Sequence, residues 1–388
     1  MHKRSVGYEE VEEIICARNN SLLREYKSGP GIFKLAEGPF TSYQRTVDVD
    51  MKTSHCEVTE TFSYKIAAPF WHYLLHFPIK RVLKNSNFSK NFNIWWAPPN
   101  RFDALTSQTI SLLCVAAIVT GFLGALIGQT ATFAAEEFGA GDRAQGILLA
   151  TVRIGVLLTV FITALADNRG RKKLLEFSLY GGCLLAVLSA VAPNLWALGI
   201  TQSFARGFAT SISILIGIMA AEAAPKGSRA YIAGLLTLSA GLGAGIPVWI
   251  LFLADLHLRG WRLLFATALI FFPVIRWIHL HLEESKRFID HIEKHRFNNG
   301  RKQKVIVKRV LFLASVAFLL FLFVSPSSQF RNEFLRDERG FSAAKISLFL
   351  LTAYTPQIIG VAIASKVSDL KGRKPVAMIA VGIGTILT

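Results

Sequence analysis

Long apolar runs separated by short polar links fill the chain from about residue 105 onward. A helix needs about 20 residues to cross the roughly 30 Å hydrocarbon core of a bilayer. The pattern predicts membrane helices at 107–131, 145–166, 175–193, 196–221, 230–254, 262–281, 309–326 and 344–365. A ninth run begins near residue 376, and the 13 residues that remain would span only about 20 Å. We therefore expect the sequence to stop inside a truncated ninth helix.

Residues 1–100 have a different pattern, in which apolar side chains alternate with period two. Two such stretches, 43–51 and 56–66, flank the polar link 52–54, and this arrangement predicts a β-hairpin. The segment 68–85 follows, with aromatic residues first and basic residues last. It either packs on the hairpin in a small module, which we favour, or lies on the membrane surface. The hairpin and helix resemble part of a helix-grip lipid-binding fold.

The change of pattern predicts four parts: a cytoplasmic hairpin-plus-helix segment at 1–100, a six-helix bundle at 105–282, a cytoplasmic linker at 283–307 and an incomplete second bundle at 308–388. The fold class is therefore an all-α membrane protein with a small α+β segment at its N-terminus.

Charge decides the orientation. The chain is 52% hydrophobic and carries a net charge of +17, with its cations gathered in alternate links. The link after the second helix holds Arg169, Arg171, Lys172 and Lys173, and the links after the sixth and eighth are similarly basic. Positive links stay in the cytoplasm, so we predict a multi-pass cell-membrane protein with a cytoplasmic N-terminus. This distribution also argues against nucleic acid as the partner of the positive charge.

One short motif occurs twice, about 200 residues apart. Asp167, Gly170, Arg171 and Lys172 return as Asp369, Gly372, Arg373 and Lys374 with the same spacing. The longer segments 138–172 and 341–374 can be aligned around it. Internal repeats of membrane helices are typical of secondary transporters. The motif itself combines a carboxylate, a turn glycine and a bidentate arginine, a cluster that can form in one conformation and break in another.

With these motifs, the chain resembles the major facilitator superfamily over residues 105–388. The family's loop signature begins with a glycine, and Thr163 and Ser365 stand there instead, so we expect looser helix packing at both places. The glycines of 237–247 favour close packing of the fifth helix, and Pro247 favours a bend in it.

Two more stretches resemble sugar-porter and metabolite-symporter members of the family. Glu222, Pro225 and Arg229 match a pattern after the fourth helix, and Glu284, Ser285 and Arg287 match one after the sixth, with Glu283 and Lys286 in place of prolines. The resemblance implies a network that holds the outward-open state together, formed by Asp167, Arg171, Glu222, Arg229, Glu284 and Arg287. The alternative is a set of solvated charges that contribute little.

Ionisable residues at membrane depth are candidates for substrate contact. Arg153 and Arg206 lie inside the second and fourth helices, and we expect at least one to face a central cavity. The alternative is that both bind backbone carbonyls. Further polar candidates are Gln129, Gln202 and Gln357. No acid lies between Thr106 and Ala135, so proton symport through the first helix is not supported.

We therefore predict a secondary transporter of a small hydrophilic solute: first an organic anion, second a sugar, third a drug. Its expected partners are the lipid bilayer and the solute, with a proton or other ion as a further candidate. The alternatives are a membrane-anchored binding module and a non-transporting fragment. The four cysteines lack metal-ligand spacing, and we expect no metal, no cofactor, no catalytic residue and no enzyme activity.

Overall fold

The computed structural model describes residues 2–6, 8–51, 56–84, 94–284 and 330–387, together with isolated positions between 307 and 322. Within these ranges, side chains are not described at 2–4, 6, 8–10, 166–168, 381 and 384–387. The predicted turn 52–54, most of the linker 283–307 with Arg287, most of the helix 309–326 and the side chain of Asp167 lie outside the described residues.

The described residues form two compact units. The first comprises Met1–Cys114, Ala223–Leu235 and Val361–Thr388, and the second comprises Val115–Glu222 and Leu236–Gly360.

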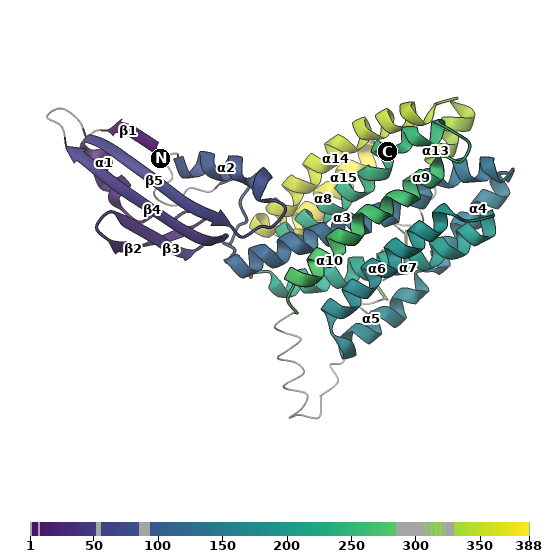
Figure 1. Ribbon diagram of the computed structural model, residues 1–388, viewed down its shortest axis with the longest axis horizontal. Coiled ribbons are helices and arrows are strands. Elements are labelled where there is room, and N and C mark those ends of the chain that lie inside the picture. The colour runs from purple at the N-terminus through teal and green to yellow at the C-terminus, as the bar shows by residue number, and fades with distance from the viewer. Residues whose placement is uncertain are drawn as a thin grey trace. The chain divides into compact units, whose positions relative to one another are not determined.

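The first unit begins with an antiparallel five-stranded sheet in the order β1-β5-β4-β3-β2 (Figure 1). Its elements are β1 (His2–Val6), α1 (Tyr8–Ile15), β2 (Arg24–Gly29), β3 (Ile32–Glu37), β4 (Phe40–Met51), β5 (Cys56–Ile66) and α2 (His72–Lys84). The predicted hairpin is β4–β5, with Val49 opposite Val58. Strands β1 to β3 and helix α1 were not predicted, because their segments are short and show weak alternation. The turn from β2 to β3 needs a positive φ, and Gly31 supplies it at +64°.

Helix α2 packs on the sheet, as the favoured alternative predicted. Its buried residues Ile79, Val82 and Leu83 form one core cluster with Phe40 and Tyr43 of β4. The three residues recur at helical spacing, so one face of α2 is committed to the core and the opposite face is left outside it.

A buried network of four charges crosses the sheet domain. Arg45 donates to Glu25 at 2.7 Å and to Glu60 at 2.9 Å, and Arg18 donates to Glu60 at 2.9 Å. Tyr43 donates its hydroxyl proton to Glu25 at 2.6 Å. Burial lowers the pKa of Arg45, but the charge and hydrogen bonds of Glu25 and Glu60 outweigh this effect and raise it. Two cations balance two anions, so the cluster is neutral and its members hold one another in place.

The membrane part contains these described helices: α3 (Ala104–Glu137), α4 (Asp142–Ile154), α5 (Leu157–Arg169), α6 (Arg171–Ala190), α7 (Leu195–Ala223), α8 (Arg229–Trp249), η2 (Leu251–Asp255), α9 (Trp261–Ala266), η3 (Thr267–Ile270), α10 (Phe271–His281), α13 (Arg331–Glu333), η4 (Phe334–Glu338), α14 (Ala343–Lys371) and α15 (Arg373–Leu387) (Figure 1). Among the described residues, seven spans are long and apolar enough to cross a membrane. Each corresponds to a predicted helix.

Three predicted single helices are interrupted in the described part of the protein. The helix expected at 230–254 is α8 followed by the 3-10 segment η2. The helix expected at 145–166 is α4 followed by α5, with the break at Gly155, whose added Cβ would lie 1.7 Å from the Ser203 carbonyl oxygen on α7. The helix expected at 262–281 is α9 and α10 with the 3-10 segment η3 between them. At Gly155 the backbone itself is the packing surface, and this contact cannot be read from apolar periodicity.

The predicted close packing of the glycine-rich helix is confirmed. An added Cβ at Gly243 of α8 would lie 1.9 Å from the Ile118 carbonyl oxygen of α3. An added Cβ at Gly121 of α3 would lie 1.8 Å from the Ala240 carbonyl oxygen of α8. Each helix thus offers a glycine to the backbone of the other, as small-residue interfaces in membranes require.

Gly243→Ala should therefore destabilise the protein by about 1–3 kcal/mol, because the new methyl group meets a backbone carbonyl that cannot move aside. Gly241→Ala is the matched control on the same helix, since nothing lies within 4 Å of its added Cβ. In a helix that substitution is neutral or gains up to about 1 kcal/mol. Thermal unfolding of both variants in detergent measures the difference, and equal midpoints would contradict the close contact.

Candidate functional site

The first copy of the loop motif brings together residues from the ends of three helices. Gly170 has a φ of +98°, which turns the chain between α5 and α6. Arg171 forms an ion pair with Glu222 at the end of α7. The backbone N–H of Lys172 donates to both carboxylate oxygens of Glu284, at 3.1 and 3.2 Å. Five of the predicted gating residues therefore meet around the N-terminus of α6.

An extension of this cluster was not predicted. Lys172 lies 3.8 Å from Glu176 one turn later on α6, and the Nδ1 atom of His279 lies 2.8 Å from the same carboxylate. Glu176 and His279 are 103 residues apart, and neither belongs to a recognisable motif.

In the second copy of the motif, the aspartate binds backbone N–H groups. The carboxylate of Asp369 accepts hydrogen bonds from the backbone N–H groups of Ala230, at 3.1 Å, and Tyr231, at 2.7 Å. These are the second and third residues of α8, whose first N–H groups lack helical partners. A carboxylate there also interacts favourably with the helix dipole. Asp369 thus caps a helix that lies about 140 residues earlier in the chain.

Three further residues of that copy and of the predicted network have exposed side chains, and the glycine of the copy forms a turn. Gly372 makes the turn between α14 and α15 with a φ of +97°. Arg373 and Lys374 have exposed side chains, and so has Arg229 at the start of α8.

The looser packing expected at Ser365 is wrong. An added Cβ at Gly234 of α8 would lie 2.3 Å from the Ser365 Cβ on α14. The glycine that the motif lacks on one helix is supplied by the facing helix, so the two backbones still approach closely.

Lys366 ties α14 to the segment that follows the sheet domain. Its Nζ donates to the carbonyl oxygens of Ile94 and Ala97, both at 2.9 Å. The Tyr231 hydroxyl donates to the Trp96 carbonyl oxygen at 2.7 Å. Sequence reasoning treated this segment only as a break between domains, because hydrogen bonds to backbone carbonyls leave no residue signature.

The two intramembrane arginines occupy half-buried positions. Arg206 on α7 donates from Nη1 to the Gly124 carbonyl oxygen of α3 at 3.1 Å. Its Nε is buried and has no hydrogen-bond partner in the described part of the protein. The sequence left open whether this arginine binds a backbone carbonyl or a substrate. The carbonyl satisfies one donor of the guanidinium and leaves the Nε donor unused among the described residues.

The polar amides have different surroundings. Gln202 is 2% exposed and donates to the Ser189 hydroxyl at 2.7 Å, so its amide serves packing between α6 and α7. Gln129 accepts a hydrogen bond from Asn332 at 2.9 Å. Gln357 is exposed on α14.

A pocket lies between α4 and α7. Its lining is apolar except for one hydroxyl and one indole, and consists of Ala144, Ile147, Leu148, Thr151, Leu195, Trp196 and Gly199. It offers a hydrophilic solute few hydrogen-bond partners, so we do not place the transported solute there.

Glu137, at the end of α3, anchors an ion cluster that was not predicted. It accepts hydrogen bonds from Trp261 at 2.7 Å and from two nitrogens of Arg262, both at 3.0 Å. Arg259 lies 3.2 Å away. Its aromatic and cationic partners come from the link and helix start more than 120 residues later.

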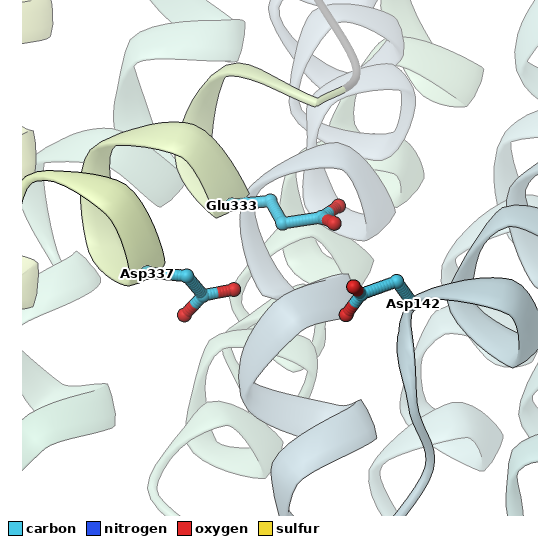
Figure 2. Close-up of side chains that lie close together, drawn as sticks. All are labelled: Asp142, Glu333 and Asp337. Carbon is cyan, nitrogen blue, oxygen red and sulfur yellow. The ribbon is translucent and has the colours of Figure 1, made fainter.

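Three carboxylates lie close together near the start of α4. Figure 2 shows Asp142 from α4 directed toward Glu333 and Asp337, and their oxygens lie within 4.8 Å of one another. Burial and the charges of the other two raise the pKa of Glu333. The Gln145 amide donates to Glu333 at 3.0 Å. Because two of the three side chains are exposed, we assign no metal ion to the group.

Comparison with known proteins identifies the family of this chain. The family model described as Major Facilitator Superfamily matches residues 113–388. The partially occluded, inward-open xylose transporter XylE from E. coli is similar in structure, with a TM-score of 0.55 and 15% identity over 70% of this chain and 73% of that one. A D-xylose-proton symporter gives 0.49 and 17% identity over 67% of each chain.

A bacterial homologue of the human lysosomal transporter Spinster gives a TM-score of 0.45 and 16% identity over 69% of this chain and 60% of that one. No curated protein matches the sequence. The family match covers well over half of the chain and agrees with the helices, the repeated loop motif and the fold of XylE. The chain therefore belongs to the Major Facilitator Superfamily and is a multi-pass membrane transporter rather than an enzyme.

Proposed function

We propose that the protein is a secondary transporter that carries a small organic anion across the cell membrane by alternating access. The observation that carries this proposal is Arg206, a half-buried cation inside a membrane span with an unused buried donor at Nε. A cation at this depth is costly unless it has a partner. A carboxylate can accept two hydrogen bonds from one guanidinium, so an organic acid would satisfy it.

Arg153 supports the same substrate class. It lies in the α4 span, which contacts α7 closely at Gly155 and Ser203. Two cations on neighbouring helices favour an anion over a neutral solute. A sugar remains the second candidate, on the resemblance of the loops at 222–229 and 284–287 to sugar porters.

The topology that we propose follows from charge. The links that contain Arg171, Lys286 and Arg373 are rich in cations, while the alternate links contain the acids around Glu137 and Glu333. The cation-rich side faces the cytoplasm in membrane proteins. The N-terminal sheet domain would then be cytoplasmic.

The ion pairs on that side form the gate in our proposal. Arg171 with Glu222, and Glu284 with the N-terminus of α6, join the ends of three helices. Asp369 joins α14 to α8 in the same manner. These contacts are polar and lie at helix ends, so they can form when the cytoplasmic side closes and break when it opens. We propose that they stabilise the outward-open state.

Arg206→Gln should reduce uptake of the transported anion at least about 30-fold, the equivalent of about 2 kcal/mol for loss of one partner of a buried charge pair. Arg206→Lys should keep part of the activity, since the charge remains. The measurement is uptake of labelled aromatic and aliphatic carboxylates and monosaccharides into proteoliposomes that contain the protein.

Arg143→Gln is the matched control, because Arg143 is exposed at the start of α4. It should leave uptake unchanged. Saturable sugar uptake that Arg206→Gln does not alter would exclude the anion, and the absence of saturable flux for every carboxylate and sugar would exclude both substrate classes.

A further inference from the structure

Helix α2 presents an unusual outer face. Tyr73, Leu74 and Phe77 are 81%, 70% and 74% exposed. At 100° per residue they lie on the side opposite the buried Ile79 and Val82. Three large apolar side chains side by side in water are unfavourable, and contiguous apolar patches mark interaction surfaces.

The same face becomes basic toward the C-terminal end of the helix. Lys80, Arg81 and Lys84 are exposed and continue the stripe that Tyr73 and Phe77 begin. The helix thus has an apolar first half and a cationic second half along one line of about 20 Å. No acidic residue lies in α2, so the stripe carries net positive charge.

Hydrogen bonds tie the apolar end of α2 to a membrane helix. The Trp71 indole donates to the Ser111 carbonyl oxygen at 3.1 Å, and the Ser111 hydroxyl donates to the Pro69 carbonyl oxygen at 2.7 Å. Ser111 is the eighth residue of α3, a 34-residue helix that is about 51 Å long. Since the hydrocarbon core takes only about 30 Å of that length, Ser111 lies near the membrane boundary.

We propose that the exposed face of α2 lies in the headgroup layer of the membrane that α3 enters, with its aromatic side chains in the interface and its cations on anionic lipid phosphates. The Ser111 contacts hold the apolar end at membrane level, and the buried face fixes which side of α2 is outward. Amphipathic helices with this division of side chains bind membrane surfaces through apolar area and anionic lipid together. The anionic leaflet is the cytoplasmic one, so this inference relies on the topology proposed above.

Pro78 lies inside α2 and favours the bilayer surface over its core. Proline has no N–H, so the carbonyl of Leu74 receives no helical hydrogen bond from residue 78. An unsatisfied carbonyl is costly in hydrocarbon but not at the hydrated interface. The surface of the bilayer, rather than its core, therefore fits α2.

The test places a fluorescent thiol label at Phe77→Cys in the intact protein, in nanodiscs of phosphatidylcholine alone or mixed with phosphatidylglycerol. Cys16→Ser removes the exposed native thiol, since the other three cysteines are buried. We expect lipids that carry a quencher on the acyl chain to quench the label strongly and aqueous iodide to quench it weakly. Tyr26→Cys on strand β2 is the matched control and should show the opposite pattern.

Replacing Lys80, Arg81 and Lys84 by glutamine should reduce lipid quenching at position 77 and abolish its dependence on phosphatidylglycerol. High salt should act in the same direction, because it screens surface charge. A label at Tyr73→Cys repeats the measurement independently, and unreactive Cys56 shows that each variant is folded. Iodide quenching at 77 equal to that at 26, or protection from both quenchers because protein covers the face, would overturn the proposal.

Discussion

Arg171→Ala should lower transport about 10- to 100-fold while the protein still inserts and folds. The side chains of Arg171 and Glu222 are each 16% exposed, so removal of Arg171 deletes an ion pair that water screens little. A loss of about 1.4–2.8 kcal/mol in one conformation shifts a two-state equilibrium by that factor. Uptake into proteoliposomes gives the flux, and the yield of monodisperse protein reports folding.

Arg169→Ala is the control for this gate, since Arg169 is an exposed arginine in the same loop. It should leave flux unchanged. The charge swap Arg171→Glu with Glu222→Arg tests the pair itself, and we expect it to recover part of the activity that each single change removes. Undiminished flux in Arg171→Ala would refute the role that we assign to this ion pair.

Arg45→Ala should destabilise the sheet domain by about 3–5 kcal/mol, because it leaves two buried carboxylates without their shared cation. Arg45 donates to both Glu25 and Glu60 and stacks 4.2 Å from the centre of the Phe33 ring. The effect is therefore the sum of lost charge pairing and lost packing. Glu60 would keep its ion pair with Arg18 and Glu25 its hydrogen bond from Tyr43, but both would lose their contacts with Arg45.

The rate at which a thiol reagent modifies Cys56 measures the stability of the sheet domain in the intact protein. Cys56 is fully buried against Phe33 and Val58, so a thiol reagent reaches it only when the domain opens. The background is again Cys16→Ser, and urea titration gives the midpoint. Arg24→Ala provides the contrast, because its pair with Glu37 is 56% and 53% exposed and contributes at most about 1 kcal/mol. Similar midpoints for the two variants would show that the buried network is not what stabilises the domain.

The membrane spans, the hairpin and the repeated loops could be predicted from the amino-acid pattern alone. Apolar runs of about 20 residues and period-two alternation are local patterns, and burial against lipid or a sheet core imposes them directly. The motif residues Gly170 and Gly372 could also be found, since a sharp turn between helices needs a positive φ at a fixed place.

The groups that the buried and intramembrane side chains bind could be identified only from the three-dimensional fold. Asp369 binds backbone N–H groups of α8, Lys366 binds backbone carbonyls near Trp96, and Arg206 binds the carbonyl of Gly124. Every residue except proline offers both backbone groups, so such a partner leaves no mark in the amino-acid pattern. Where the partner is a side chain, as for Glu137 with Arg262, more than 120 residues of chain separate the two, and only the fold brings them together.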